Sequence, residues 1–294
     1  MAAYTIENEK LSVTIDAHGA ELSSIYDKEN DRELIWQADA AFWNRHAPVL
    51  FPNVGKYYGG HFTYNGKAYP MGQHGFARDT EFEQIAAGED FVTYRLCADE
   101  ESKKKYPFDF VLEITHRLEN NRLSVEWNVK NVDDKEMYFT IGGHPAFNVN
   151  ILPDTDFEDY SLVFKEGIET LSYILIDAEN GTALTDKTYK LELTNSKYAL
   201  KKDMFDKDAL IFDNGQIEWV GLALPNGKPY IALESKNFPN FGIWSKPGAP
   251  YVCLEPWCGR CDNKGFHGEI SEKPGINTLK AGEVFKKSYD IIVY

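Results

Sequence analysis

The stretch LSVEWNV at residues 123–129 decides the fold class. Its odd-numbered residues are apolar and its even-numbered residues are polar, which is the period of a β-strand buried on one face. Two asparagines stand just before it, at 120–121, and two aspartates follow it at 133–134. Because these residue types favour turns, the segment is predicted to be one strand of an antiparallel meander.

The same rhythm continues in both directions along the chain. Further short strands are predicted at residues 11–15, 108–115, 137–141, 219–224, 230–233 and 288–293. Asn-Gly pairs, typical of hairpin turns, stand at 65–66, 180–181 and 226–227. Short helices are predicted at 39–45, 100–106 and 195–204, and residues 152–195 are expected to be loop-like. Many short strands with few helices indicate an all-β antiparallel sandwich or barrel.

Size and composition predict one large domain. The chain has 294 residues, of which 43% are hydrophobic, so it can build a sizeable core. We find no internal repeat and no linker rich in proline, glycine or serine. Residues 1–294 are therefore expected to fold as a single domain.

The charge and the termini exclude several classes of partner. The chain carries 31 basic and 46 acidic residues, a net charge of −15, so it would repel nucleic acid and anionic membranes. The N-terminus lacks the basic start and apolar stretch of a signal peptide, and no segment reaches the roughly 18–20 apolar residues of a membrane helix. Four cysteines are too few for a disulfide scaffold. We expect a reduced, cytoplasmic protein, either a monomer or a weak homodimer.

Two histidines have the local setting of proton-transfer groups. His144 follows a predicted strand in the segment GGHPAFN, where glycine allows close approach and proline restricts the backbone. His74 lies in the loop GQHGFAR, between Gln73 and a following aromatic residue. An imidazole is suited to acid–base work near neutral pH. The alternatives stay open: His144 can be a core histidine bonded to a carbonyl, and His74 can belong to an ordinary turn.

A third candidate is Glu255, in the apolar segment VCLEPW. Burying a carboxylate is costly unless it is paired, and burial raises its pKa toward the range of a general base. The sequence therefore favours a functional role for Glu255. Two histidines and one glutamate in apolar surroundings can move protons to and from a neutral polar molecule without a cofactor.

Metal, redox and nucleotide chemistry are less favoured. Cys258 and Cys261 have the Cys-x-x-Cys spacing, but a structural zinc site normally has a second pair, and a thioredoxin-like pair sits in a βαβ context. The remaining histidines show no spacing of a ligand set. The chain also lacks the Gly-x-Gly-x-x-Gly, P-loop and Gly-x-Ser-x-Gly motifs. No metal and no cofactor are expected.

Three motifs in order, QHGFAR, GHPAFN and LEPW, resemble the aldose 1-epimerase (galactose mutarotase) family, and in particular its LacX-like branch. The stretches APVLFPNVG at 47–55 and LKAGE at 279–283 extend the resemblance over nearly the whole chain. It implies a large antiparallel β-sandwich of the galactose mutarotase type (a supersandwich) that binds a sugar in a cleft on one face.

The resemblance also implies roles for individual residues. Glu255 would be the base that removes the proton of the anomeric hydroxyl, and His144 the acid that protonates the ring oxygen. His74 would stabilise charge beside the reacting centre. The ring would open, the C1–C2 bond would rotate, and closure would give the other anomer of a hexose.

Four further residues are expected to bind the substrate. Lys56 stands where the family usually has an arginine, so the positive charge is kept but the planar, two-pronged donor is lost. Gln73 and Arg78 belong to the loop of His74. Asp213 is the candidate for the family's substrate-binding aspartate, although a turn-forming role is equally compatible with its position.

Two other functions stay open. Arg78 beside the cleft would suit a hexose 6-phosphate, because an arginine can hold a phosphate group. A non-catalytic carbohydrate-binding sandwich is the second alternative, since Trp43, Trp244 and Trp257 offer platforms on which a sugar can stack. A protein that only binds sugar has no need of the acid–base set, and this favours an enzyme.

Overall fold

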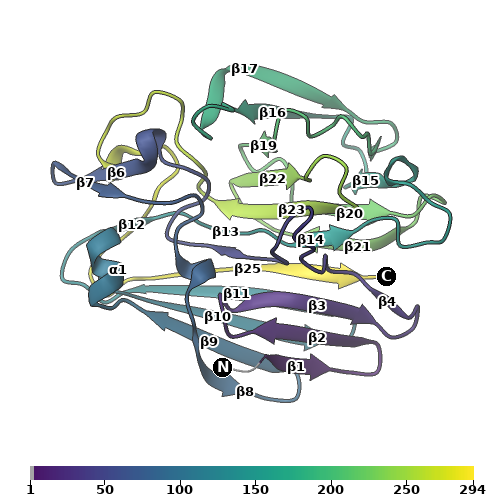
Figure 1. Cartoon of the computed structure of the whole chain (residues 1–294), viewed down its shortest axis with the longest axis horizontal. Coiled ribbons are helices and arrows are strands. Elements are labelled where there is room, and N and C mark those ends of the chain that lie inside the picture. Colours follow the sequence, from purple (N-terminus) through teal and green to yellow (C-terminus); the bar gives the residue numbers. More distant parts are fainter. Residues whose placement is uncertain (1–2) are drawn as a thin grey trace.

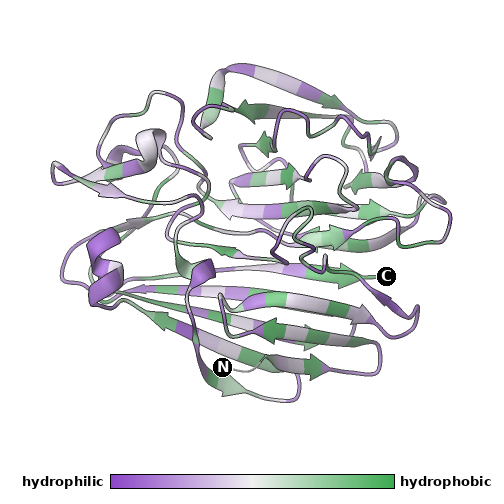
Figure 2. Cartoon of the chain, in the orientation of Figure 1, coloured by the Kyte–Doolittle hydropathy of each residue, from purple (hydrophilic) through white to green (hydrophobic). Residues whose placement is uncertain are grey.

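Two large antiparallel sheets dominate the protein, whose computed structural model describes residues 3–294 (Figure 1). In spatial order, the larger sheet contains β18 (Lys197–Ala199), β15 (Ser161–Phe164), β20 (Trp219–Ala223), β21 (Pro229–Glu234), β25 (Val284–Val293), β11 (Arg122–Asn131), β10 (Phe110–Glu119), β9 (Phe91–Cys97) and β8 (Glu83–Ala87). The predicted strand at 123–129 is the middle of β11, and its apolar side chains are buried as expected. The alternation continues along the neighbouring strands (Figure 2).

The second sheet supplies most of the candidate site. In spatial order it contains β17 (Ala183–Glu192), β16 (Thr170–Ile176), β19 (Leu210–Phe212), β22 (Asn240–Trp244), β23 (Tyr251–Cys258), β13 (Ile141–Gly143) and β5 (Val49–Leu50), with β14 (Ala146–Asn148) also paired to β23. Every residue of β23 is buried, so this strand lies at the centre of the packing.

Smaller sheets cover the flanks. The first contains β1 (Tyr4–Glu7), β2 (Leu11–Asp16), β3 (Glu21–Asp27) and β4 (Arg32–Glu33). A hairpin pairs β6 (His61–Tyr64) with β7 (Lys67–Pro70), and a two-stranded sheet pairs β12 (Met137–Phe139) with the distant β24 (Asn277–Leu279). The four-stranded sheet packs against the larger sheet through β1, which contacts β9 and β10 (Figure 1). The hydroxyl of Tyr94 adds a bond by donating to the carbonyl of Ile15 at 3.3 Å.

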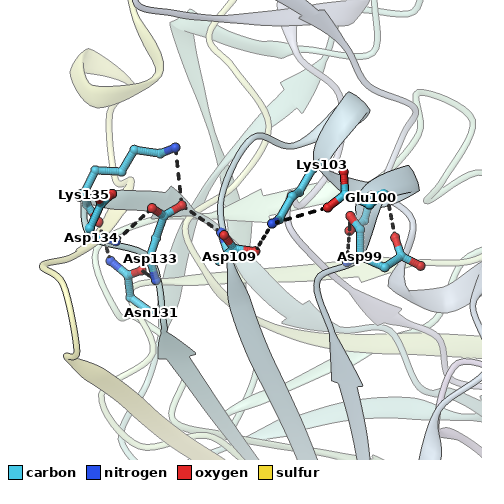
Figure 3. Close-up of polar contacts among 9 residues, drawn as sticks. Asp99, Glu100, Lys103, Asp109, Asn131, Asp133, Asp134 and Lys135 are labelled. Atoms are coloured by element: carbon cyan, nitrogen blue, oxygen red, sulfur yellow. Dashed lines mark hydrogen bonds and ion pairs between the residues drawn. The ribbon is translucent and has the colours of Figure 1, made fainter.

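One α-helix forms where a helix was predicted at 100–106. This helix, α1 (Glu100–Lys105), is capped by Asp99, which accepts from the backbone N–H of Ser102. It buries none of its side chains and is hydrophilic throughout (Figure 2). Lys103 joins it to Asp109 at 2.6 Å (Figure 3). Four 3₁₀ turns complete the described elements: η1 (Tyr58–Gly60), η2 (Ala77–Asp79), η3 (Phe157–Asp159) and η4 (Ile270–Glu272).

Three local predictions were wrong. Residues 39–45 form turns rather than a helix, because the carboxylate and carbonyl of Asp39 bond the N–H groups that follow it. The segment 195–204 contains β18 and turns, with Asn195 and Ser196 both at positive φ. The expected loop at 152–195 contains β15, β16 and β17, whose polar side chains reflect strands with an exposed face.

One continuous core runs through the chain. A single cluster of buried apolar residues includes members from Ile6 to Val293 and links both large sheets. Within the described residues, no helix is both long and apolar enough to cross a membrane.

Candidate active site

Strand register brings the first two predicted residues together. Gly142 of β13 lies opposite Trp257 of β23, and Ala146 of β14 lies opposite Cys253. Both pairings share one register, so His144, midway between them, lies across from Glu255. The Nε2 atom of His144 is 3.3 Å from Oε2 of Glu255. The contact is thus fixed by backbone pairing rather than by flexible loops.

Glu255 is buried without full compensation. Only 1% of the residue is exposed, and its Oε2 has no hydrogen-bond partner among the described residues. Burial raises the pKa of this carboxyl well above its usual value, and the charge of Asp208 raises it further. A carboxyl with a raised pKa can exchange protons near neutral pH.

Trp257 forms a wall beside this carboxyl. Its ring occupies the space above two glycines: a Cβ added to Gly142 or Gly242 would lie 2.5 or 2.3 Å from the indole. Its Nε1 is buried and has no hydrogen-bond partner within residues 3–294. The glycines therefore allow a large aromatic side chain to line the floor of the site.

His144 is held between aromatic rings. The ring of Trp43 lies over it with centroids 4.9 Å apart, and Trp244 meets it edge to face at 5.8 Å. Burial, together with the charges of Arg78 and Arg45, lowers the pKa of His144 to about 3. The imidazole is therefore neutral at neutral pH.

His74 completes the predicted set. Its backbone adopts φ +66°, and the N–H of Gly55 donates to its Nδ1 at 3.0 Å. Because Nδ1 accepts, the neutral ring carries its proton on Nε2. The side-chain nitrogen of Gln73 lies 3.2 Å from this atom, so a hydrogen bond between them requires the Gln73 amide to present its oxygen instead. Burial and the neighbouring His144 lower the pKa of His74 well below 6.5. The two imidazole rings lie 5.5 Å apart.

These groups open into a cleft of about 400 Å³ over one face of the second sheet. It is lined by Trp43, Arg45, Val54, Gly55, Lys56, Gln73, His74, Arg78, His144, Ile176, Asp177, Ala178, Gly181, Asp208, Ala209, Ile211, Trp244, Glu255, Trp257 and Cys261. The structure thus brings together every predicted catalytic residue, three of the four predicted binding residues and all three tryptophans.

Asp213 is the exception and needs correction. It follows β19, but within the described chain it is not among the residues that line the cleft. Its carboxylate accepts from Asn240 at 2.7 Å and from Nε of Arg260 at 3.0 and 3.1 Å. These bonds occupy Asp213 in holding β19 to the segment after β23, which is a structural role.

Sequence reasoning missed three charged residues of the cleft, Arg45, Asp177 and Asp208. Asp208 precedes β19, has φ +71°, and lies close enough to Glu255 to raise its pKa. Arg45 donates to Asp79 at 2.7 Å, and Asp79 also lies 3.7 Å from Nε of Arg78. Asp208 had no sequence signal, whereas Arg45 stands two residues after Trp43, which the sequence had already marked as a sugar platform.

One group of described residues has the spacing of metal ligands. Potential ligand atoms of His144, Cys253 and Glu255 lie within 4.8 Å of one another. Burial raises the pKa of both Cys253 and Glu255, so both would have to lose a proton to bind a cation. Cys258 and Cys261 are buried, carry free thiols and do not belong to this group. As a whole, the site offers a buried acid–base pair, a neutral imidazole, aromatic walls and charges at the rim.

Comparisons with known proteins agree with this geometry. A sequence model of the family described as Aldose 1-epimerase matches residues 2–291. The plasmid-encoded Protein LacX of Lactococcus lactis subsp. lactis is 32% identical, with 98% of each chain covered. The structure of a galactose mutarotase related enzyme from Lactobacillus acidophilus superposes with a TM-score of 0.94 at 36% identity, covering 99% of this chain and 97% of the other. A galactose mutarotase-like protein from Lactobacillus casei superposes with a TM-score of 0.90 at 34% identity, covering 99% and 100%. The chain therefore belongs to the aldose 1-epimerase family, in its LacX-like branch, and shares the galactose mutarotase fold.

Proposed function

We propose that this protein is an aldose 1-epimerase that interconverts the α and β anomers of a hexose without a cofactor. The observation that carries the proposal is the buried contact between His144 and Glu255 in a cleft walled by tryptophans. Opening a hemiacetal ring requires one base at the anomeric hydroxyl and one acid at the ring oxygen. The pair provides both groups, Glu255 on β23 and His144 between β13 and β14.

The protonation of the pair suits this reaction. With the pKa of Glu255 raised and that of His144 lowered, a proton shared by the two side chains is favoured on the carboxyl rather than on the imidazole. Moving that proton from Glu255 to His144 creates the base and the acid. Glu255 then takes the proton of the anomeric hydroxyl, His144 gives its proton to the ring oxygen, and the C1–O5 bond breaks. After rotation about C1–C2, closure on the other face reverses both transfers.

The remaining lining residues bind and orient the sugar. The Nε2–H of His74, which lies beside the amide of Gln73, would donate to an oxygen at the reacting centre, since Nδ1 is already engaged. Lys56 and Gln73 offer hydrogen-bond donors, and Asp208 offers acceptors in the place that the sequence had assigned to Asp213. The faces of Trp43 and Trp244 suit the apolar faces of a sugar ring.

Polarimetry or NMR of freshly dissolved α-D-glucose and α-D-galactose tests the proposal. We expect the wild type to speed anomer equilibration, and Glu255→Gln and His144→Asn each to lose about 10²–10⁴-fold in kcat. The matched control is Glu126→Gln, which alters an exposed carboxylate on β11 of the other sheet and is expected to keep full activity. A wild type inactive on free aldoses and on their 6-phosphates would refute the isomerase proposal.

A hexose 6-phosphate is the second candidate substrate, favoured by a specific observation. Three cations, Lys56, Arg45 and Arg78, line the same cleft, and the two arginines share the single carboxylate of Asp79. This arrangement leaves positive charge available for an anionic substituent. If a phosphosugar is the substrate, Arg45→Gln lowers kcat/KM for the 6-phosphate at least tenfold more than for the free hexose. Equal losses on both substrates would favour the free aldose.

A protein that only binds sugars would bind hexoses without speeding their equilibration, so the polarimetric assay also separates this alternative. We further propose that the chain acts as one domain in the cytoplasm, as a monomer or weak homodimer. The free thiols of all four cysteines support a reducing compartment.

A further inference from the structure

The turn between β16 and β17 forms one wall of the cleft. Residues of this turn, among them Asp177 and Gly181, line the cleft beside Lys56. Gly181 has φ +69°, and its Cα faces the side chain of Lys56. A Cβ added to Gly181 would lie 2.6 Å from Cδ, 3.1 Å from Cε and 3.3 Å from Nζ of Lys56. The side chain of Lys56 therefore lies flat across a residue that has no side chain.

Both partners of this contact are anchored. The N–H of Ala183 donates to the carbonyl of Asp262 at 2.8 Å, and the N–H of Asp262 donates to the carbonyl of Lys56 at 3.0 Å. Through these two bonds, Asp262 links the start of β17 to the backbone of Lys56. Asp262 is itself fixed by a buried ion pair with Lys273 at 2.5 Å.

The end of the turn is also closed by its own contacts. The N–H of Gly181 donates to the carbonyl of Asp177 at 2.7 Å. The carboxylate of Asp177 accepts from Asn180 at 2.7 Å and lies 3.4 Å from Nζ of Lys264. Neither the turn nor the backbone of Lys56 can shift without breaking several bonds, so the direction of the lysine side chain depends on the space above Gly181.

We propose that Gly181 is a positioning residue, which directs the Lys56 ammonium into the cleft and so makes the β16–β17 turn the element that orients the sugar. The proposal rests on the proposed function in one respect, namely that Lys56 contacts the substrate. The glycine acts only through the lysine. Replacing it with alanine fills the space that the lysine stem occupies, and the flexible stem must swing away toward solvent.

The contact can be tested without any assay of activity. In Gly181→Ala, the acetylation rate of Lys56 by an N-hydroxysuccinimide ester, followed by peptide mass spectrometry, is expected to rise at least threefold. The matched control is Gly66→Ala, which has the same backbone strain at φ +73° but nothing within 4 Å of the new Cβ. The control is expected to leave Lys56 labelling within twofold of wild type. Equal labelling of Lys56 in wild type and Gly181→Ala would overturn the proposal.

Kinetics then separate positioning from general damage. Gly181→Ala is expected to raise KM for the sugar about tenfold, the loss of one charged hydrogen bond, with kcat within twofold. In a Lys56→Ala background the same glycine substitution should change KM less than twofold, because the side chain that it displaces is gone. An equal increase in both backgrounds would refute the positioning role. A wild type without activity would refute the proposed function, while the labelling result would still decide the contact.

Discussion

His116 predicts a specific acid sensitivity of the fold. It lies in β10, where only 2% of the residue is exposed, between Val92 and Val125 of the neighbouring strands. Its Nδ1 has no hydrogen-bond partner among the described residues. Burial lowers the pKa of His116 from 6.5 to about 3. The folded protein therefore keeps this ring neutral over a range in which the unfolded chain protonates it.

The sign and the size of the change in the free energy of unfolding follow from the linkage between proton binding and folding. Below pH 6.5 the unfolded state binds a proton that the folded state refuses, so the free energy of unfolding falls as the pH falls and levels off near 3. Between pH 7 and pH 4 this one residue costs about 3 kcal/mol of stability, at about 1.4 kcal/mol for each pKa unit. His116→Leu removes the titrating ring and keeps an apolar side chain in an apolar layer.

Urea unfolding followed by tryptophan fluorescence measures the effect. We expect His116→Leu to unfold within about 1.5 kcal/mol of wild type at pH 7 and to gain about 3 kcal/mol relative to wild type by pH 4. Comparing the two proteins cancels the acid losses from the other buried histidines, which both retain. His61→Leu, at an exposed position, is the control and should follow wild type at both pH values. Parallel curves for wild type and His116→Leu would show that burial does not hold this ring neutral.

Three further predictions concern the site and its supports. Lys273→Met leaves Asp262 as a buried charge without its ion-pair partner. In urea unfolding it should lower the free energy of unfolding by about 3–5 kcal/mol, and a loss under 1 kcal/mol would mean that the pair is dispensable. Arg78→Gln removes a cation that lowers the pKa of His144, so the acid limb of the kcat/KM profile should move to higher pH, and an unmoved limb would contradict this coupling. The control for Arg78→Gln is Arg117→Gln, which alters an arginine on β10 of the larger sheet. Dialysis against EDTA should leave the mutarotation rate unchanged, and restoration by zinc of an activity lost on dialysis would show that the reaction uses a metal.

Strand periodicity predicted most of the fold, and short motifs predicted which residues would meet in the candidate site. The alternation of β11 extends to the whole sheet because paired strands share one register, so the buried face of one strand continues on the next. His144 and Glu255 could be singled out as candidate site residues because polar residues in apolar segments need a reason to be buried. Their distance could not be predicted, since it depends on a register shared by β13, β14 and β23.

The errors come from residues whose role depends on long-range partners. Asp213 and Asp208 flank the same three-residue strand, β19, and the sequence gives no means of telling which of them faces the cleft. The outcome is decided by Arg260, 47 residues further along the chain, which pairs with Asp213. Residues 39–45 resembled a helix in composition, but local bonds to Asp39 favour turns.

The candidate site draws its residues from two kinds of element, and this bears on how the substrate of such a protein could change. His144 and Glu255 belong to paired backbone segments deep in the sheet, whereas Lys56, Asp208 and Gly181 come from connections at its edge. If the proposed function holds, exchanging these connections would change which monosaccharide the cleft accepts and leave the paired segments of His144 and Glu255 unaltered.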